Sequence, residues 1–260
     1  MTSWFEAVVQ RASSLGVGTA SLGRRMTTRN FPQEVVTFKK YVSELDKDQL
    51  PTQCIEFYNS NFAEKSDKEL SNLNIHNDIC RIIHHIEINI DTILSDQSML
   101  QNTLTFLNSS MTVYYSNSKN DADVFKIVQK LIQTNDETII SSASVFIHMC
   151  TKKQNLLNYF FSGKQLVILW SLCYIENPIA FMYYAPLFNT AVTSFTPKNP
   201  EAFELFIEKV LEDFNSGAIV PQILSVSMFF VSSIVYKFNT GDFLISLLPY
   251  IFELSPECEN

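Results

Sequence analysis

Glycine is scarce in this chain and accounts for only 6 of its 260 residues. Turn-rich sandwiches and barrels need many backbone positions with positive φ, which glycine adopts most readily. The chain also shows almost no pattern typical of a β-strand. These absences exclude a turn-rich all-β fold and direct attention to helices.

Charged residues are also few, at 18% of the chain, while hydrophobic residues make up 46%. That balance excludes a disordered chain. The net charge is −8, but the first 40 residues carry +4 and the remaining 220 carry −12. Because duplex nucleic acid is bound largely by neutralising its phosphates, an acidic body predicts no nucleic-acid partner.

Cysteine is present without any CxxC pair, so neither a paired zinc motif nor a disulfide framework is evident. The five cysteines are Cys54, Cys80, Cys150, Cys173 and Cys258. Their odd number and apolar neighbours indicate buried free thiols in a reducing compartment. We therefore expect a cytoplasmic protein.

Apolar residues recur at helical spacing from about residue 31 to residue 254. The cleanest stripe consists of Ile75, Ile79, Ile82, Ile83, Ile86 and Ile90. The same spacing predicts helices over residues 35–45, 100–114, 124–132, 139–150, 166–175, 203–214, 218–238 and 243–254. Short polar side chains favour helix starts, so we expect Asp121 and Asp123 to cap the 124–132 helix, and Asn135 and Asp136 to open the next.

From residue 135 onward, mixed helices alternate with nearly apolar ones, and Asn, Asp or Pro mark the turns. An inner helix of a stack is covered on both sides, which explains this alternation. Residues 135–254 resemble armadillo or HEAT-type repeats, whose units of roughly 40 residues contain two or three helices each. The resemblance implies an all-α fold, a right-handed superhelical stack (an α-solenoid), over residues 31–257. It also implies a scaffold or adaptor for other proteins or peptides.

Local signatures of catalysis are missing, since the chain has neither an HExxH motif nor a nucleophile elbow. We therefore expect that the protein is not an enzyme and that it binds no cofactor. A metal-binding helical protein is an alternative, because His76, Cys80 and His84 are spaced i, i+4, i+8 on one side of the isoleucine-rich helix. Imidazole and thiolate are good zinc ligands, but a straight helix cannot bring residues two turns apart to one ion. We favour the interpretation that they flank an apolar stripe.

Two stretches, residues 177–197 and 214–236, contain no charged residue. About 20 apolar residues can cross a bilayer, so a multi-span membrane protein is a further alternative. Prolines, asparagine and several hydroxyl side chains dilute both stretches, and no basic cluster flanks them. Buried helices of a soluble protein are the favoured interpretation.

Residues 1–30 form a chemically distinct segment, which we expect to be a flexible basic tail with a short amphipathic helix. Trp4, Phe5 and Val8 fall on one side of that helix. The opening sequence Met1-Thr2-Ser3-Trp4-Phe5 resembles the start of golgin-type membrane tethers. The resemblance implies a peripheral membrane trafficking or regulatory subunit that inserts these side chains at the headgroup boundary.

Other interpretations of the tail remain open, namely a mitochondrial transit peptide or an inert disordered terminus. Arg24-Arg25-Met26-Thr27 fits the preference of basophilic kinases. Phosphate on Thr27 would oppose an anionic membrane surface and release the tail. At the other end, the very apolar helix over residues 243–254 lacks the polar cap that a solenoid needs, which predicts self-association there.

Overall fold

The computed structural model describes residues 32–177, and beyond them residues 180–181, 183–184, 205–206, 208–210, 212–213 and 216–217. The chain divides into two compact units, Met1–Thr37 and Phe38–Asn260. All regular structure in the described ranges is helical and none is a strand. The predicted all-α fold is therefore confirmed.

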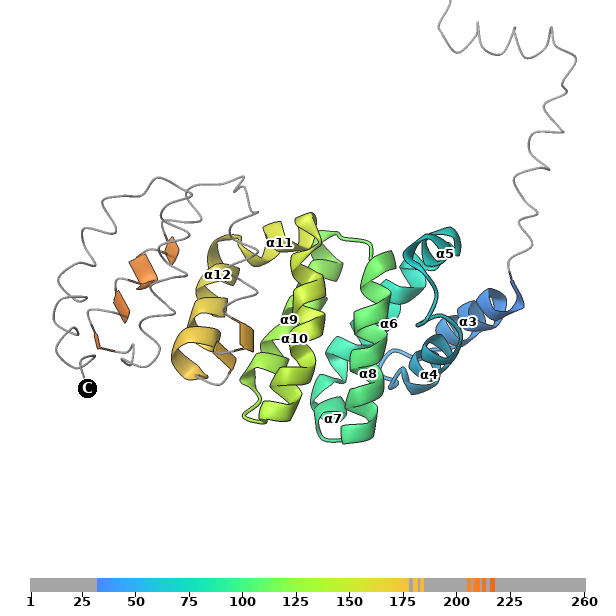
Figure 1. Ribbon diagram of the computed structural model, residues 1–260, viewed down its shortest axis with the longest axis horizontal. Helices are drawn as coiled ribbons and strands as arrows, with labels where there is room; N and C mark the ends of the chain where they lie inside the picture. Colours follow the sequence, from blue (N-terminus) through green and yellow to red (C-terminus); the bar gives the residue numbers. More distant parts are fainter. Residues whose placement is uncertain are drawn as a thin grey trace, which may run out of the picture. The chain divides into compact units, whose positions relative to one another are not determined.

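Twelve elements lie in the described part of the chain (Figure 1). They are α3 (Gln33–Ser43), α4 (Thr52–Asn61), α5 (Asp67–Asn72), α6 (His76–Ile88), α7 (Ile90–Leu94), α8 (Gln97–Ser110), η1 (Met111–Val113), α9 (Ser118–Gln133), α10 (Glu137–Thr151), α11 (Gln154–Phe160), α12 (Gly163–Trp170) and the π-helix η2 (Ser171–Glu176).

The predicted isoleucine stripe forms the buried side of α6. Ile79, Ile82, Ile83 and Ile86 are each 0% exposed. The helix is shorter than the stripe, because it ends at Ile88 and the stripe runs to Ile90. Asn89 follows as the C-cap, and its side-chain amide donates to the His85 carbonyl at 2.9 Å. A second helix, α7, begins directly afterwards. The helical spacing of the isoleucines continues from α6 into α7, so the end of α6 could not be predicted from it.

Asx side chains begin three successive helices. Asp96 accepts a hydrogen bond from the Met99 N–H at 2.9 Å at the start of α8, and Asn117 and Asp136 cap α9 and α10 in the same way. The expectation that Asp136 opens a helix is confirmed. Each cap satisfies backbone N–H groups that have no partner inside the helix.

The expectation that Asp121 and Asp123 cap a helix is wrong. Both lie inside α9 and are buried, because the helix begins one turn earlier, after Asn117. Asn117 supplies the cap, which leaves both aspartates free to bond elsewhere. Asp121 accepts from the hydroxyls of Tyr114 and Ser116.

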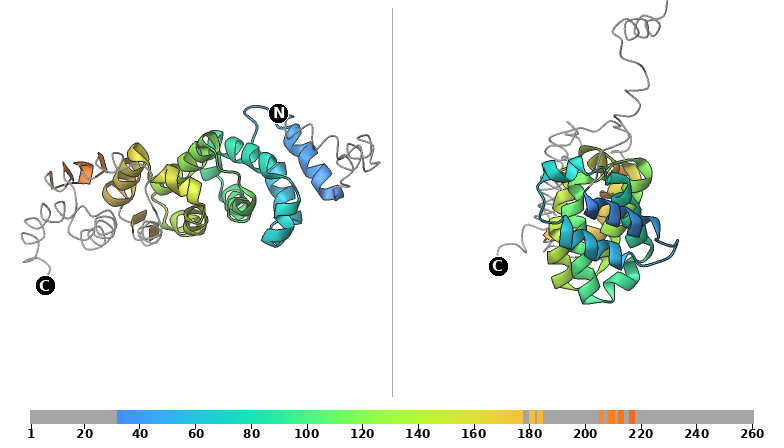
Figure 2. Two further views of the ribbon diagram at one scale, coloured as in Figure 1. Left: turned by 90° about the horizontal axis from the view of Figure 1, so that it is seen from above. Right: turned by 90° about the vertical axis from the view of Figure 1, so that its right-hand side faces the viewer.

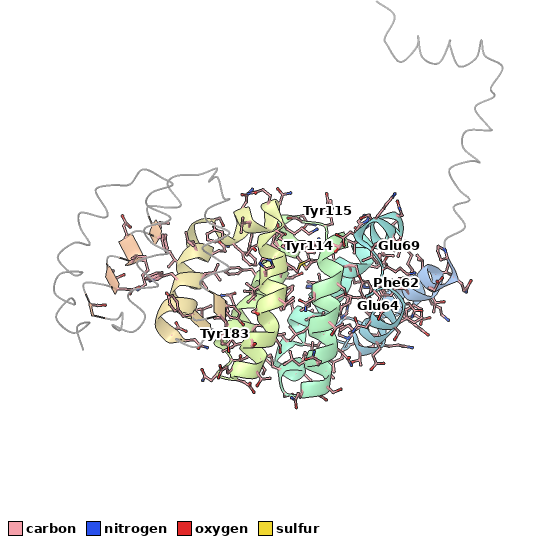
Figure 3. The ribbon with its side chains drawn as sticks, in the orientation of Figure 1. Phe62, Glu64, Glu69, Tyr114, Tyr115 and Tyr183 are labelled. Atoms are coloured by element: carbon pink, nitrogen blue, oxygen red, sulfur yellow. The ribbon has the colours of Figure 1, made fainter. Side chains whose placement is uncertain are left out.

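Three short helices, α4, α5 and α11, were not expected from the apolar spacing. α5 and α11 have only 6 and 7 residues, and the buried residues of α4, Cys54, Ile55 and Tyr58, lie within about one turn, so none displays a repeated stripe. The start of α5 nevertheless carries a local signal, a capping box in which the Glu69 carboxylate accepts from the Ser66 N–H at 2.9 Å. Glu69 is labelled in Figure 3.

Helices of the second unit contact helices that lie a short distance along the chain. α4 packs on α8 and α8 on α10, while α6 packs on α9, and α9 on α11 and η2. Figures 1 and 2 show the corresponding progression of colours from teal through green to yellow. The long-range side-chain hydrogen bonds, in helices and in the connections between them, join described residues that are 35 to 46 positions apart.

No helix in the described ranges combines the length and the apolar character needed to cross a bilayer. The two uncharged stretches, residues 177–197 and 214–236, lie largely outside those ranges. Trp4, Phe5, Val8 and Thr27 of the tail and the predicted 243–254 helix also lie outside them.

Candidate functional site

Three polar pairs cross the junction between α6–α7 and α9. His84 Nδ1 lies 3.0 Å from Asp123 Oδ2, Lys126 Nζ lies 2.8 Å from Glu87 Oε1, and Lys130 Nζ lies 2.9 Å from Asp91 Oδ1. We call these six residues the polar seam. Each pair joins residues 39 positions apart.

The constant separation of 39 follows from helix geometry. On both partners the polar residues are spaced i, i+3, i+7. Asp123, Lys126 and Lys130 share one face of α9, whereas His84 and Glu87 lie on α6 and Asp91 follows them on α7. A constant offset also requires that α6–α7 and α9 run in the same direction. In the polar seam, successive polar residues of α6–α7 therefore pair in order with successive polar residues of α9.

Burial sets the electrostatics at one end of the seam. Asp123 is 5% exposed, and this burial is the main reason that its pKa is raised. The nearby charge of Glu87 raises the pKa of Asp123 further, whereas His84 lowers it. Lys126 is more open, and its hydrogen bond to Glu87 raises its pKa. A positive charge beside Asp123 and Glu87 is therefore favourable.

His84, Glu87 and Asp123 form a compact set of ligand atoms. One nitrogen of His84 and one oxygen from each carboxylate lie within 4.8 Å of one another. The His84 side chain is 38% exposed and the Asp123 side chain 7%, so the set opens to solvent on the histidine side. An imidazole with two carboxylates can hold a cation.

A cleft of about 470 Å³ lies along the same junction. Its lining residues are Glu87, Ile88, Ile90, Asp91, Lys126, Gln129, Lys130 and Gln133. Ile88 is 42% exposed, which gives the cleft an apolar contact beside its amides and charges. This combination suits an extended peptide segment, which offers both backbone polar groups and side chains.

A second cavity, of about 250 Å³, lies where α7 and α8 meet the start of α10. Its lining residues are Leu94, Ser95, Gln97, Leu100, Gln101, Leu104, Asp136, Thr138, Ile139 and Ser142. Asp136 already serves there as a helix cap, through hydrogen bonds from the N–H groups of Thr138 and Ile139. This cavity offers fewer charged groups than the seam.

Two of the sequence-predicted metal candidates contact Tyr115, and the third, His84, lies apart from them in the polar seam. His76 lies against Tyr115, with ring centroids 6.0 Å apart. Cys80 is buried, and its thiol donates to the Tyr115 carbonyl at 3.6 Å. Only His84 belongs to the ligand set found among the described residues, and its companions there are Glu87 and Asp123.

Sequence reasoning missed the other two members of that set. Glu87 lies three positions after His84, so the closeness of these two side chains on α6 could have been predicted from helical spacing. Asp123 comes from another helix, and its position gave no signal beyond its polarity near a helix start. The pairing depends on the register of α6 against α9.

A second buried polar cluster lies beside the seam at the start of α9. The Tyr114 hydroxyl donates to Asp121 Oδ1 at 2.7 Å, and the Ser116 hydroxyl donates to the same carboxylate. Burial raises the pKa of Asp121 and, with the help of that carboxylate, also the pKa of Tyr114. Figure 3 places Tyr114 beside Tyr115 in the connection between α8 and α9. This cluster anchors the connection.

Comparison with known proteins gives no relative. No family model matches the chain. No curated protein and no solved structure matches it either. Its function is therefore argued from the contacts described above.

Proposed function

We propose that the chain is a non-catalytic protein–protein interaction scaffold or adaptor of the cytoplasm, built as an armadillo/HEAT-like right-handed solenoid. The observation that carries this proposal is the narrow range of separations, 35 to 46 residues, of the long-range side-chain hydrogen bonds in the described part of the chain. In a solenoid each repeat touches only its neighbours, so contacts span about one repeat length. Armadillo and HEAT repeats have that length, roughly 40 residues.

The helix contacts support two rows of stacked helices, each of which we call a file. One file is α6, α9 and η2, and the other is α4, α8 and α10. The second file extends to residue 184, because the Tyr184 hydroxyl donates to the Ile140 carbonyl of α10 at 2.8 Å. The first extends to residue 213, because the Trp170 indole donates to Asp213 at 2.9 Å. Alternation of the two files is the arrangement expected of stacked helix pairs.

The described thiols are poor candidates for a catalytic nucleophile. Cys54, Cys80 and Cys150 are buried free cysteines. Burial raises the pKa of all three, to about 11 for Cys54. Because the thiolate is the nucleophile, such side chains are inert at neutral pH. Free thiols also suit the reducing cytoplasm.

The cleft along the polar seam is the contact surface that we propose for a partner. Gln129 and Gln133 are one helical turn apart on α9 and line it together with the exposed Ile88. Amide side chains both donate and accept hydrogen bonds, which suits the backbone of an extended peptide. A segment bound there would contact two neighbouring repeats at once.

Affinity purification of the tagged full chain tests the scaffold proposal. We expect at least one partner at near-stoichiometric yield, and amine-reactive cross-links from that partner to Lys126 and Lys130. The Gln129→Ala/Gln133→Ala variant should lose the partner. A matched Gln53→Ala/Gln154→Ala variant, which changes exposed amides of α4 and α11, should retain it.

Two results would contradict the proposal. The absence of any partner above the level of an unrelated bait would argue against a scaffold. A partner that cross-links only to lysines elsewhere, such as Lys47 and Lys68, and survives the cleft variant would place binding on another surface.

A further inference from the structure

We propose that His84, Glu87 and Asp123 form a binding site for Zn²⁺ that links α6 and α9. His84 and Glu87 belong to α6 and Asp123 belongs to α9. The proposal does not depend on a protein partner. It assigns an inorganic ligand to one end of the polar seam.

The geometry needs only a small adjustment to hold the ion. Zinc lies about 2.0–2.2 Å from nitrogen and oxygen ligands, which places tetrahedral ligand atoms roughly 3.4 Å apart. His84 Nδ1 and Asp123 Oδ2 are 3.0 Å apart, and all three ligand atoms lie within 4.8 Å of one another. Glu87 has three side-chain torsions, so its carboxylate can close the remaining distance.

The ligand set selects the class of ion. Imidazole suits zinc and its transition-metal neighbours, whereas calcium and magnesium prefer sets made entirely of oxygen. Two carboxylates would offset the charge of a divalent ion. Three protein ligands leave a fourth position, which opens toward solvent on the side of the half-exposed His84 and can be filled by water.

Burial provides a reason for the site to attract a cation. Asp123 is 5% exposed and close enough to Glu87 for the two negative charges to repel each other. Zinc would relieve this repulsion more fully than the protein's own counterion does. That counterion is Lys126, whose ammonium lies 2.8 Å from Glu87 Oε1. Its side chain is 56% exposed, so the ammonium can move into solvent when a metal binds.

Competition with Lys126 gives the proposal a directional test. If zinc and the Lys126 ammonium share Glu87, removal of the lysine charge should tighten zinc binding. If His84, Glu87 and Asp123 only pair with other side chains and bind no zinc, removal of the lysine charge will bring no gain in zinc affinity. We expect Lys126→Gln to lower the dissociation constant several-fold.

Isothermal titration calorimetry of ZnCl₂ into the chelator-treated full chain measures the binding. We expect one zinc per chain, with affinity reduced at least about tenfold in His84→Ala and in Glu87→Gln, as for loss of a group that matters to a metal site. His76→Ala and His148→Ala are matched histidine controls outside the set and should bind as the unaltered chain does. Circular dichroism of each variant monitors folding, and Glu87→Gln, at a partly exposed position, is the mildest change.

The outcomes are distinct. Loss of zinc binding in both ligand variants, with retention in the controls and a gain in Lys126→Gln, supports the site. Absence of zinc binding by the unaltered chain overturns the proposal. So does binding that His84→Ala and Glu87→Gln leave unchanged, because the zinc would then occupy other groups. None of these results bears on whether a protein partner is bound.

Discussion

Asp121 shows how one buried carboxylate makes stability depend on pH. It is 4% exposed and accepts hydrogen bonds from Tyr114 and Ser116, yet burial still raises its pKa. The folded chain therefore binds this proton more tightly than the unfolded chain does. Its contribution to the free energy of unfolding falls as pH rises from about 3.9, the ordinary aspartate value, through the raised folded pKa.

Asp121→Asn should remove that part of the pH dependence. The variant keeps an acceptor oxygen for Tyr114 but cannot ionise, so its stability relative to the unaltered chain should increase as pH rises above about 4. Urea denaturation at a series of pH values measures the difference. The exposed Asp46→Asn provides the control. Parallel pH curves for Asp121→Asn and the unaltered chain would contradict this account.

Asn177 makes three hydrogen bonds from one buried side chain. Its Nδ2 donates to the carbonyls of Ile132 at 2.7 Å and Thr134 at 2.8 Å, and its Oδ1 accepts from the Ala180 N–H at 3.0 Å. Asn177→Ala would leave these backbone groups without that partner, so we expect a loss of about 2–4 kcal/mol in unfolding free energy. Chemical denaturation measures it. Asn155→Ala, at an exposed position of α11, serves as the comparison, and equal losses in both variants would refute the argument.

The residues of the candidate site were only partly predictable. His84 was identified from its spacing on α6, and Glu87 could have been added by the same rule. Asp123 was assigned to a helix start, because polarity near a helix start is usually explained by capping. Its actual role depends on a neighbour 39 positions away, which no local pattern specifies.

Predicted helix starts were right at one helix and wrong at another. Asp136 was expected at the start of a helix and does cap α10, whereas α9 begins after Asn117, one turn before the expected caps. Amphipathic helices were predictable where apolar residues recur over two or more turns. α5 and α11 were missed because each spans at most two turns, and α4 because its buried residues, Cys54, Ile55 and Tyr58, lie within about one turn.

Asp136→Ala should destabilise the fold by about 1 kcal/mol, the usual cost of a lost N-cap. The carboxylate accepts from the N–H of Thr138 at 2.8 Å and of Ile139 at 3.3 Å, and alanine cannot replace either bond. Asp136→Ser should recover most of the loss, because serine also caps. Thermal and urea unfolding measure both variants, and equal effects of alanine and serine would show that capping is not the cause.

The separation of contacts along the chain predicts how the second unit unfolds. If each helix pair depends mainly on its neighbours, a small cavity should loosen nearby helices and leave distant ones unchanged. Ile83→Val, at a position that is 0% exposed, should cost about 1 kcal/mol. Hydrogen exchange should then accelerate in α6, α8 and α9 and remain unaltered in α12. An equal change in every helix would indicate a single cooperative core.

The helical class of the chain followed from its composition and spacing, since few glycines and repeated apolar stripes leave little alternative. The order in which helices contact one another did not follow. A stripe shows that a helix has a buried side, but many helices in this chain have similar stripes. Which two meet is decided by side-chain fit and by matched polar pairs such as Glu87 with Lys126.

The matched register of α6–α7 and α9 determines where the chain can change length. One residue inserted within α9, between Asp123 and Lys126, would rotate everything after it by about 100° and detach both lysines from their carboxylates at once. An extra residue in the connection between α7 and α8 would shift all three separations equally and leave every pair of the seam intact. The connection before Asn117 is less suitable, because Tyr114 and Ser116 there are bonded to Asp121. Insertions and deletions should therefore be tolerated between α7 and α8 and rejected inside α6 and α9.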